Sequence, residues 1–328
     1  MNSQRQQVLR AVTQAAELCE RYPVGSRTGF DVTGAVEDLG VPLLYRPLDR
    51  LLGATIAVET GGQGVLVTTQ RDHHVQRFTL AHELGHVLLG HSTTFDLTVG
   101  VENSSVHAPT SPSERAADAF ASELLMPRSL IASLARRHAW KGALLRDPTV
   151  AYQLSLRLGI SFAATCWGLA GQRLVSTSAA QELQATQPKV IKRGLAPDPL
   201  ISDPWADVWE LTEQDSGCLL EASQHDVFAV RLYDNSSAGF LWELDDLGPD
   251  CDVVKDTTED LGERLGVPAA RTVFLKYREP GFHRLHFAHR RPWSGQVAAH
   301  IDLTLDNHGK ETVGLPRKTK LRALGVAA

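Results

Sequence analysis

Apolar and polar residues follow different periods in the two parts of this 328-residue chain. Over residues 4–22, apolar residues recur at a spacing of three and four, which places them on one side of a helix. Beyond residue 205, apolar residues alternate with polar ones in short segments that turn residues separate, which is typical of β-strands. The pattern therefore predicts an α+β fold, with a mainly helical first part and a β second part.

The first part also contains a small predicted sheet. The pattern predicts helices over residues 4–22, 31–39 and 111–127, and strands over residues 41–45, 52–59 and 64–69. A peptide can add as an extra strand to an exposed edge of such a sheet. The sheet could present a peptide to the helix that follows it, or it could serve the fold alone. The sequence does not decide which edge of the sheet is free.

The helix after these strands carries ionisable side chains at a fixed spacing. It contains the motif His-Glu-x-x-His at His82, Glu83 and His86. Side chains four residues apart share a helix face, so His82 and His86 can offer two imidazoles to one metal ion. Glu83 lies one step round the helix and can reach a water molecule on that metal. Asp72 suits the N-cap of this helix, and Gly90 suits its end.

A second helix supplies the third ligand. Over residues 111–127, Ser111 suits the N-cap and Pro112 the first helical turn, and Glu114 and Asp118 share one face of the helix. Catalytic zinc usually takes three protein ligands, so we predict Glu114 as the third and Asp118 as the partner that orients a ligand imidazole. Ser111 and Glu114 also have the spacing of a capping box, which requires no metal.

Other side chains near these helices are weaker candidates. His91 is a rival ligand that fits poorly, because the long metzincin pattern would need residues that this chain lacks after the motif. Glu102 and Glu123 are further carboxylates of this region. His107, in a loop rich in Ser and Pro, could polarise a scissile carbonyl, although most histidines in such loops have no catalytic role.

The two helices together resemble the ImmA/IrrE family of metallopeptidases, over roughly residues 1–175. The resemblance rests on Phe-Thr-Leu-Ala-His-Glu-Leu-Gly-His at 78–86 and on Glu-x-x-Ala-Asp-x-Phe-Ala-x-Glu-Leu-Leu-Met-Pro at 114–127. It implies a zincin-like, mainly helical domain with a small sheet. It also implies that His82, His86 and Glu114 bind the metal and that Glu83 is the general base. Members of the family typically cleave a helix-turn-helix repressor, which switches on stress-response or mobile-element genes. Two imidazoles and one carboxylate favour Zn²⁺, with Mn²⁺ as the alternative.

The second part of the chain has two loops of recognisable sequence. Its strands are predicted over residues 208–211, 227–232, 272–277, 283–288 and 300–305. One loop contains Asn235, Gly239, Phe240 and Trp242, and the other contains Arg291, Pro292 and Trp293. These loops resemble the hallmark loops of the chagasin family of cysteine-peptidase inhibitors, which implies an immunoglobulin-like β-sandwich.

The loops also depart from the chagasin pattern. Ser-Ser-Ala at 236–238 replaces Pro-Thr-Thr, and the family's Gly-rich loop is not recognisable within residues 262–271. These departures favour binding of some other protein over inhibition of a peptidase. We therefore interpret the following residues as partner-binding loops, for a peptidase or another protein: Asn235, Gly239, Arg291, Pro292 and Trp293. Trp242 is expected in the core.

Composition narrows the class of protein. The formal charge of −5 argues against general nucleic-acid binding. No apolar run approaches the roughly 20 residues of a membrane span, and the N-terminus opens no signal peptide, so no membrane association and a cytoplasmic location are expected. The four cysteines are scattered without a CxxC pair and are predicted to be reduced thiols.

One basic stretch stands out within this acidic chain. Residues 128–194 hold ten Lys and Arg against two Asp and Glu. Within this stretch, residues 150–161 and 164–169 have the outline of a helix-turn-helix around a Gly turn. The apolar character of the second helix favours packing or substrate docking, so direct DNA binding is not expected.

The sequence thus predicts two domains and a function. The regions are a zincin-like metallopeptidase domain with trailing helix-turn-helix-like helices (1–178), a linker (179–204), a chagasin-like β-sandwich (205–308) and a basic tail (309–328). The favoured function is that of a zinc-dependent endopeptidase whose β domain senses or binds a partner. Two other hypotheses are a non-catalytic binding protein that acts through the β domain, and a DNA-binding regulator that uses residues 150–170.

Overall fold

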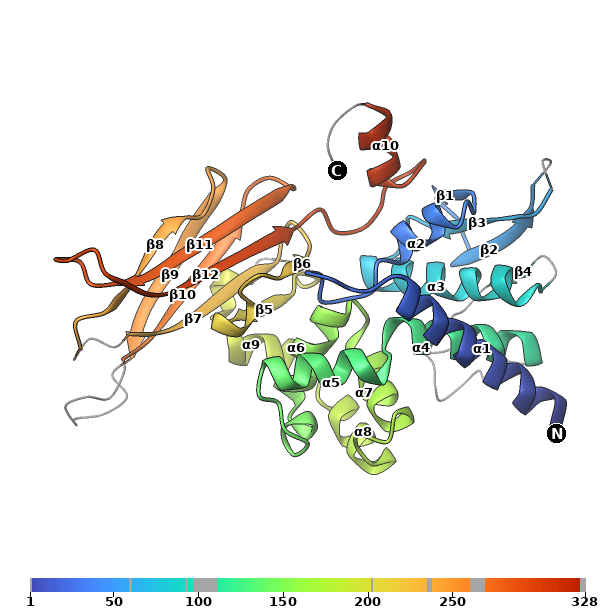
Figure 1. The fold of residues 1–328 in the computed structure, drawn as a ribbon, viewed down its shortest axis with the longest axis horizontal. Helices are drawn as coiled ribbons and strands as arrows, with labels where there is room; N and C mark the ends of the chain where they lie inside the picture. Colours follow the sequence, from blue (N-terminus) through green and yellow to red (C-terminus); the bar gives the residue numbers. More distant parts are fainter. Residues whose placement is uncertain are drawn as a thin grey trace. The chain divides into compact units, whose positions relative to one another are not determined.

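The computed structural model describes residues 2–58, 61–91, 94–96, 111–201, 203–234, 238–259 and 269–324. The chain divides into two compact units. Unit 1 comprises Met1–Gly25, Gly29–Gln184 and Lys310–Ala328, and unit 2 comprises Ser26–Thr28 and Ala185–Gly309. Helices dominate unit 1 and strands dominate unit 2, so the predicted α+β class is confirmed (Figure 1). Among the described residues, no helix combines the length and the apolar character needed to cross a membrane.

Unit 1 combines helices with one four-stranded sheet. Its helices are α1 (Asn2–Arg21), α2 (Val32–Asp38), α3 (His73–Leu89), α4 (Pro112–Leu125), α5 (Arg128–Arg137), α6 (Pro148–Leu158), α7 (Phe162–Gly171), α8 (Thr177–Ala185) and α10 (Arg317–Ala323). Its strands are β1 (Leu43–Arg46), β2 (Gly53–Ala57), β3 (Gln63–Thr68) and β4 (Thr94–Asp96), in the order β1-β3-β2-β4. β1 and β3 are parallel, and the other neighbours are antiparallel. α3 packs on β2 and β3 and also against α4, which in turn packs on α1 (Figure 1).

The helix α3 begins and ends where the sequence predicts. Asp72 Oδ1 accepts the backbone N–H of Val75 at 2.9 Å and so caps the first turn. Gly90 has a φ of 73°, which lets the chain leave the helix in the left-handed conformation. Every residue from Phe78 to His86 is buried. The polar side chains of this segment therefore need partners inside the protein.

Small residues allow α3 and α4 to approach closely. A Cβ atom added at Gly85 would lie 3.1 Å from Cδ1 of Phe120. Ala117 and Ala121 on α4 are fully buried. The Ser111 hydroxyl accepts the backbone N–H of Glu114 at 3.1 Å, so the predicted N-cap of α4 is confirmed. This packing places the start of α4 beside the motif of α3.

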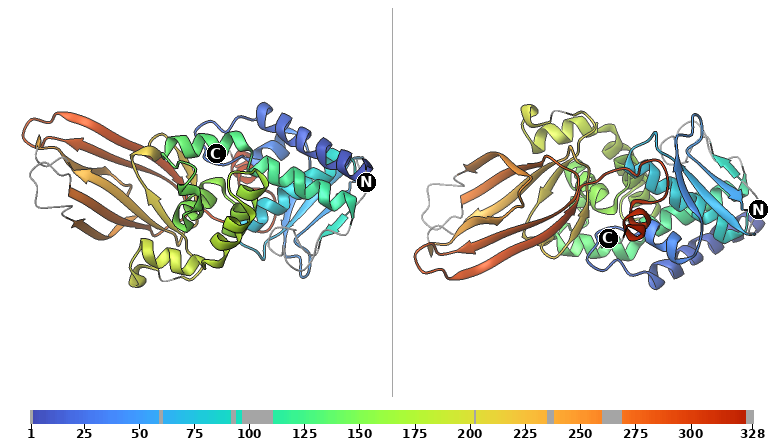
Figure 2. Two further views of the ribbon diagram at one scale, coloured as in Figure 1. Left: turned by 90° about the horizontal axis from the view of Figure 1, so that it is seen from below. Right: turned by 90° about the horizontal axis from the view of Figure 1, so that it is seen from above.

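The C-terminal segment, which was predicted from the sequence as a basic tail, forms part of unit 1 (Figure 2). Gly314 pairs with Tyr45 at the outer edge of β1 through two backbone hydrogen bonds of 2.8 and 2.9 Å. In α3, the Gln76 amide donates to the carbonyl of Glu311 at 3.1 Å and accepts the N–H of Glu311 at 2.7 Å. Gln76 and Glu311 lie 235 positions apart, so no local pattern could indicate this contact.

Unit 2 contains two four-stranded sheets. The first runs in the order β5 (Val208–Leu211), β7 (Val227–Asp234), β10 (Ala269–Tyr277) and β9 (Cys251–Glu259). The second runs in the order β6 (Leu219–Glu221), β12 (Val297–Asp306), β11 (Phe282–Arg290) and β8 (Leu241–Asp246). Alternate residues are buried, as with Leu285 and Phe287 on β11. Trp242 on β8 is 1% exposed, so its predicted place in the core is confirmed.

Residues 179–204, predicted as a linker, contain helical structure. α8 buries Ala179, Ala180 and Leu183, and the further helix α9 (Pro188–Leu195) buries Ile191 and Leu195. These apolar residues recur at helical spacing, which explains why the segment folds as helices.

Candidate metal centre

Three side chains from α3 and α4 converge on one point. His82 Nε2 lies 3.0 Å from His86 Nε2 and 3.2 Å from Glu114 Oε2, and His86 Nε2 lies 3.5 Å from Glu114 Oε1. Ligand atoms of the three residues all lie within 4.8 Å of one another, and this is the one such His/Cys/Asp/Glu group among the described residues. The imidazoles are buried, whereas the Glu114 side chain is 25% exposed. Glu114 is therefore the most exposed of the three side chains.

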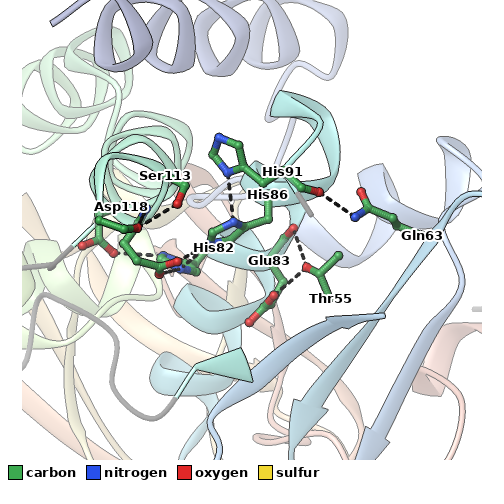
Figure 3. A network of polar contacts seen from close by, with 10 residues as sticks. Thr55, Gln63, His82, Glu83, His86, His91, Ser113 and Asp118 are labelled. Atoms are coloured by element: carbon green, nitrogen blue, oxygen red, sulfur yellow. Dashed lines mark hydrogen bonds and ion pairs between the residues drawn. The ribbon is translucent and has the colours of Figure 1, made fainter. Parts of the chain in front are cut away.

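Each imidazole is also held at its outer nitrogen. His82 Nδ1 lies 2.9 Å from Asp118 Oδ1, and His86 Nδ1 lies 2.9 Å from His91 Nδ1 (Figure 3). Asp118 belongs to α4, and His91 follows the end of α3. The two Nε2 atoms are therefore turned toward each other and toward Glu114.

The charges of the cluster suit a cation. Hydrogen bonds with His82 and His86 hold the pKa of Glu114 well below its usual range. Burial, together with the neighbouring His86, lowers the pKa of His91. Glu114 is therefore anionic at neutral pH, and His91 is uncharged.

Glu83 points to the sheet side of α3, where β2 holds it. The Thr55 hydroxyl donates to Glu83 Oε2 at 2.6 Å, and both residues are fully buried (Figure 3). Gly53 lies against the same carboxylate, because a Cβ atom at Gly53 would be 2.6 Å from Glu83 Oε1 and 2.5 Å from Thr79 Cγ2. A glycine at this position thus leaves the space that the Glu83 side chain occupies.

The donor set fits a divalent metal ion. Two imidazole nitrogens and one carboxylate oxygen form the ligand set of many catalytic zinc sites. An imidazole that binds metal through Nε2 carries its proton on Nδ1, and in this cluster both Nδ1 atoms meet a partner. A cation would also satisfy the two Nε2 atoms, which face each other at 3.0 Å.

The other sequence candidates lie elsewhere. Glu123 accepts a hydrogen bond from the Gln172 amide at 3.1 Å and is not part of the cluster. His91 lies behind His86 and contacts its outer nitrogen, not its inner one. Glu102 and His107 lie outside the described residues.

Sequence reasoning missed three residues of the site, namely Gly53, Thr55 and Gln63. The Gln63 amide donates to the backbone carbonyl of His91 at 2.7 Å (Figure 3). All three residues lie on the strands β2 and β3, where their types are unremarkable. Only the packing of the sheet on α3 reveals their role, so no motif could have identified them.

In unit 2, the two predicted loops meet. Arg291 Nε donates to the carbonyl of Ala238 at 3.0 Å, and its guanidinium lies 4.5 Å from the centre of the Phe240 ring. Trp293 is 74% exposed, and its ring covers Gly239, which has a φ of 75°. Pro292 is exposed as well, whereas Asn235 lies outside the described residues. The described residues of these loops therefore present an exposed aromatic surface.

We predict that Gly53→Ala destabilises unit 1. The added Cβ would overlap Glu83 and Thr79 in a packed region, which typically costs about 1–3 kcal/mol. Thermal unfolding of the full chain should show a lower midpoint for the transition of unit 1. Gly142→Ala is the matched control, because a Cβ atom at Gly142 has no neighbour within 4 Å. Equal midpoints for the two variants would contradict the close packing of β2 on Glu83.

Two family models match separate parts of the chain. Residues 36–169 match the peptidase M78 model, described as an IrrE N-terminal-like domain. Residues 221–305 match the model of the chagasin family peptidase inhibitor I42. No curated protein sequence matches the chain.

Solved structures resemble the chain over about a third of its length. The cysteine protease inhibitor EhICP2 from Entamoeba histolytica is 22% identical over 32% of this chain and 100% of its own, with a TM-score of 0.30. Amebosin is 16% identical over 31% of this chain and 98% of its own, with a TM-score of 0.25. PbICP-C, in a structure of its complex with falcipain-2, is 16% identical over 32% of this chain and 93% of that one, with a TM-score of 0.22. The chain thus joins a region that matches the IrrE N-terminal-like domain of the peptidase M78 family to a region that matches the chagasin inhibitor family.

Proposed function

We propose that this protein is a zinc-dependent endopeptidase that cleaves a helix-turn-helix transcriptional repressor and so switches on stress-response or mobile-element genes. The convergence of His82, His86 and Glu114, inside a region that matches a peptidase family, carries this proposal. The repressor comes from the resemblance to the ImmA/IrrE family. We assign the reaction to the cytoplasm, because the proposed substrate acts on DNA.

We assign each residue of the site a role in metal binding or in proton transfer. His82, His86 and Glu114 hold the metal, and Asp118 orients the His82 ring through its outer nitrogen. When bound, zinc polarises a scissile carbonyl and acidifies a water molecule. Glu83 accepts a proton from the attacking water and delivers it to the leaving amine. Zn²⁺ is preferred to Mn²⁺, because two of the three ligands are imidazoles.

Thr55 and the sheet support this chemistry. The Thr55 hydroxyl fixes one oxygen of the Glu83 carboxylate at 2.6 Å, which limits the side chain to one orientation. Gly314 already pairs with the outer edge of β1, so we propose that a substrate strand adds at the other edge of the sheet, along β4.

We also propose a fold type for each region. A zincin-like domain over residues 1–178 is supported by the packing of α3 on the sheet and on α4. An immunoglobulin-like sandwich over residues 205–308 is supported by the two four-stranded sheets. Residues 310–328 then complete the first domain from the C-terminal end of the chain.

The β domain is proposed as a sensing or partner-binding module. The exposed Trp293 and the Arg291–Phe240 stack form an aromatic surface of the kind that proteins use for binding. The match to the chagasin family peptidase inhibitor model over residues 221–305 makes a peptidase one candidate partner. This surface also supports the alternative of a non-catalytic binding protein.

The DNA-binding alternative has less support. α6 and α7 have the helix-turn-helix outline, with Gly159 in the left-handed conformation between them. α7 contains neither Lys nor Arg, and half of its residues are buried. Such a helix offers little to phosphates or base edges, so direct DNA binding is not part of the proposal.

If the protein is a peptidase, Glu83→Gln should abolish cleavage and retain metal binding. Host cells that make the wild type or Glu83→Gln, with and without stress, should be compared by mass spectrometry of new protein N-termini. A repressor fragment should appear with the wild type alone. Glu123→Gln is the matched control, because it makes the same change on α4 away from the cluster. The same fragment in cells with Glu83→Gln would contradict the assignment of Glu83.

The binding surface predicts a loss of partner affinity in Trp293→Ala. A residue at the centre of a contact typically costs tenfold or more in affinity when truncated. Affinity capture with the full chain from host lysate, followed by titration of the captured protein, would measure the change. Trp205→Ala is the matched control, since Trp205 is 83% exposed in the same unit. Equal weakening by both variants would exclude the Arg291–Trp293 loop as the binding site.

A further inference from the structure

A histidine that the ligand set does not use lies directly behind His86. His91 follows Gly90, whose left-handed turn brings the chain back over the end of α3. The backbone N–H of His91 donates to the carbonyl of His86 at 3.0 Å. The two rings meet nearly edge to face, at 68°, with their Nδ1 atoms 2.9 Å apart. This geometry is that of a hydrogen bond between two imidazoles.

Such a bond holds one proton, and the metal site determines where it lies. An imidazole that binds metal through Nε2 is neutral and carries its proton on Nδ1. His86 must then donate, and His91 Nδ1 must accept. The proton of His91 itself is consequently on Nε2. His91 thus accepts the Nδ1–H of His86 as Asp118 accepts the Nδ1–H of His82, and the acceptor is an imidazole nitrogen in place of a carboxylate oxygen.

The position of His91 is fixed from the sheet. The Gln63 side chain, at the start of β3, donates to the backbone carbonyl of His91 at 2.7 Å (Figure 3). The segment after α3 is therefore tied both to the helix and to the strand. This arrangement holds the ring in place without making it a ligand.

We propose that His91 is a positioning residue, which fixes the tautomer and the ring orientation of His86, and that Gln63 holds it there. This role rests on the proposed metal site. The positioning role of His91 affects the affinity for the metal, so this role can be tested without knowledge of the peptide substrate.

The test is the zinc affinity of the purified full chain, measured by competition with a chromophoric chelator. His91→Ala should weaken zinc binding by about 10- to 100-fold, the usual effect of removing the outer partner of a ligand histidine. His91→Asn places an amide oxygen near the position of Nδ1 and should restore affinity to within about threefold of the wild type. Gln63→Ala should give a smaller loss than His91→Ala. His225→Ala, at an exposed histidine of unit 2, should change nothing.

Cobalt substitution separates positioning from ligation. Since His91 is not a ligand in this proposal, the visible spectrum of the Co²⁺-loaded chain should be the same in the wild type and in His91→Ala. Wild-type affinity in His91→Ala would overturn the role, and so would a Co²⁺ spectrum that reports a lost ligand. Absence of zinc binding by the wild type would overturn the proposed function together with this role. Equal zinc affinity of the wild type and His91→Ala would overturn this role alone.

Discussion

The packing of α3 against α4 is the contact on which the site depends. It buries two imidazoles and sets a carboxylate of α4 opposite them. Polar groups buried in this way cost about 1–3 kcal/mol each when they lack a partner. Gly85 lets the helices approach, since the Phe120 ring fills the space that a side chain would need. The same close packing that stabilises the unit therefore gathers the donors.

Each polar side chain of the motif is held by a different element. His82 is held by α4, His86 by the segment after α3, and Glu83 by β2. The three side chains are therefore positioned by separate elements of the unit and not by one loop. The small sheet thus contributes to the position of Glu83 through Thr55.

The parts of the fold with a strong local period could be predicted from the sequence. α3 and α4 combine helical spacing with clear caps at Asp72, Gly90 and Ser111, and the structure contains both. Strands β6, β8 and β9 were missed, and the residues of β9, for example, are largely exposed and show no alternation. The return of Glu311 and Gly314 to unit 1 was missed as well, because it depends on contacts between distant positions. In the site, the ligand candidates follow from spacing, whereas Thr55 and Gln63 are recognised only once the sheet is packed on α3.

The chain joins a cluster of metal-ligand residue types to an exposed aromatic loop. One unit holds the converging donors, and the other carries an exposed aromatic loop. If the converging donors bind a metal, the purified chain should contain zinc, which atomic emission measures. We expect one zinc per wild-type chain, one in Glu123→Ala and none in Glu114→Ala. Full zinc occupancy in Glu114→Ala would contradict the assignment of Glu114 as a ligand and would leave it as a residue of the helix cap.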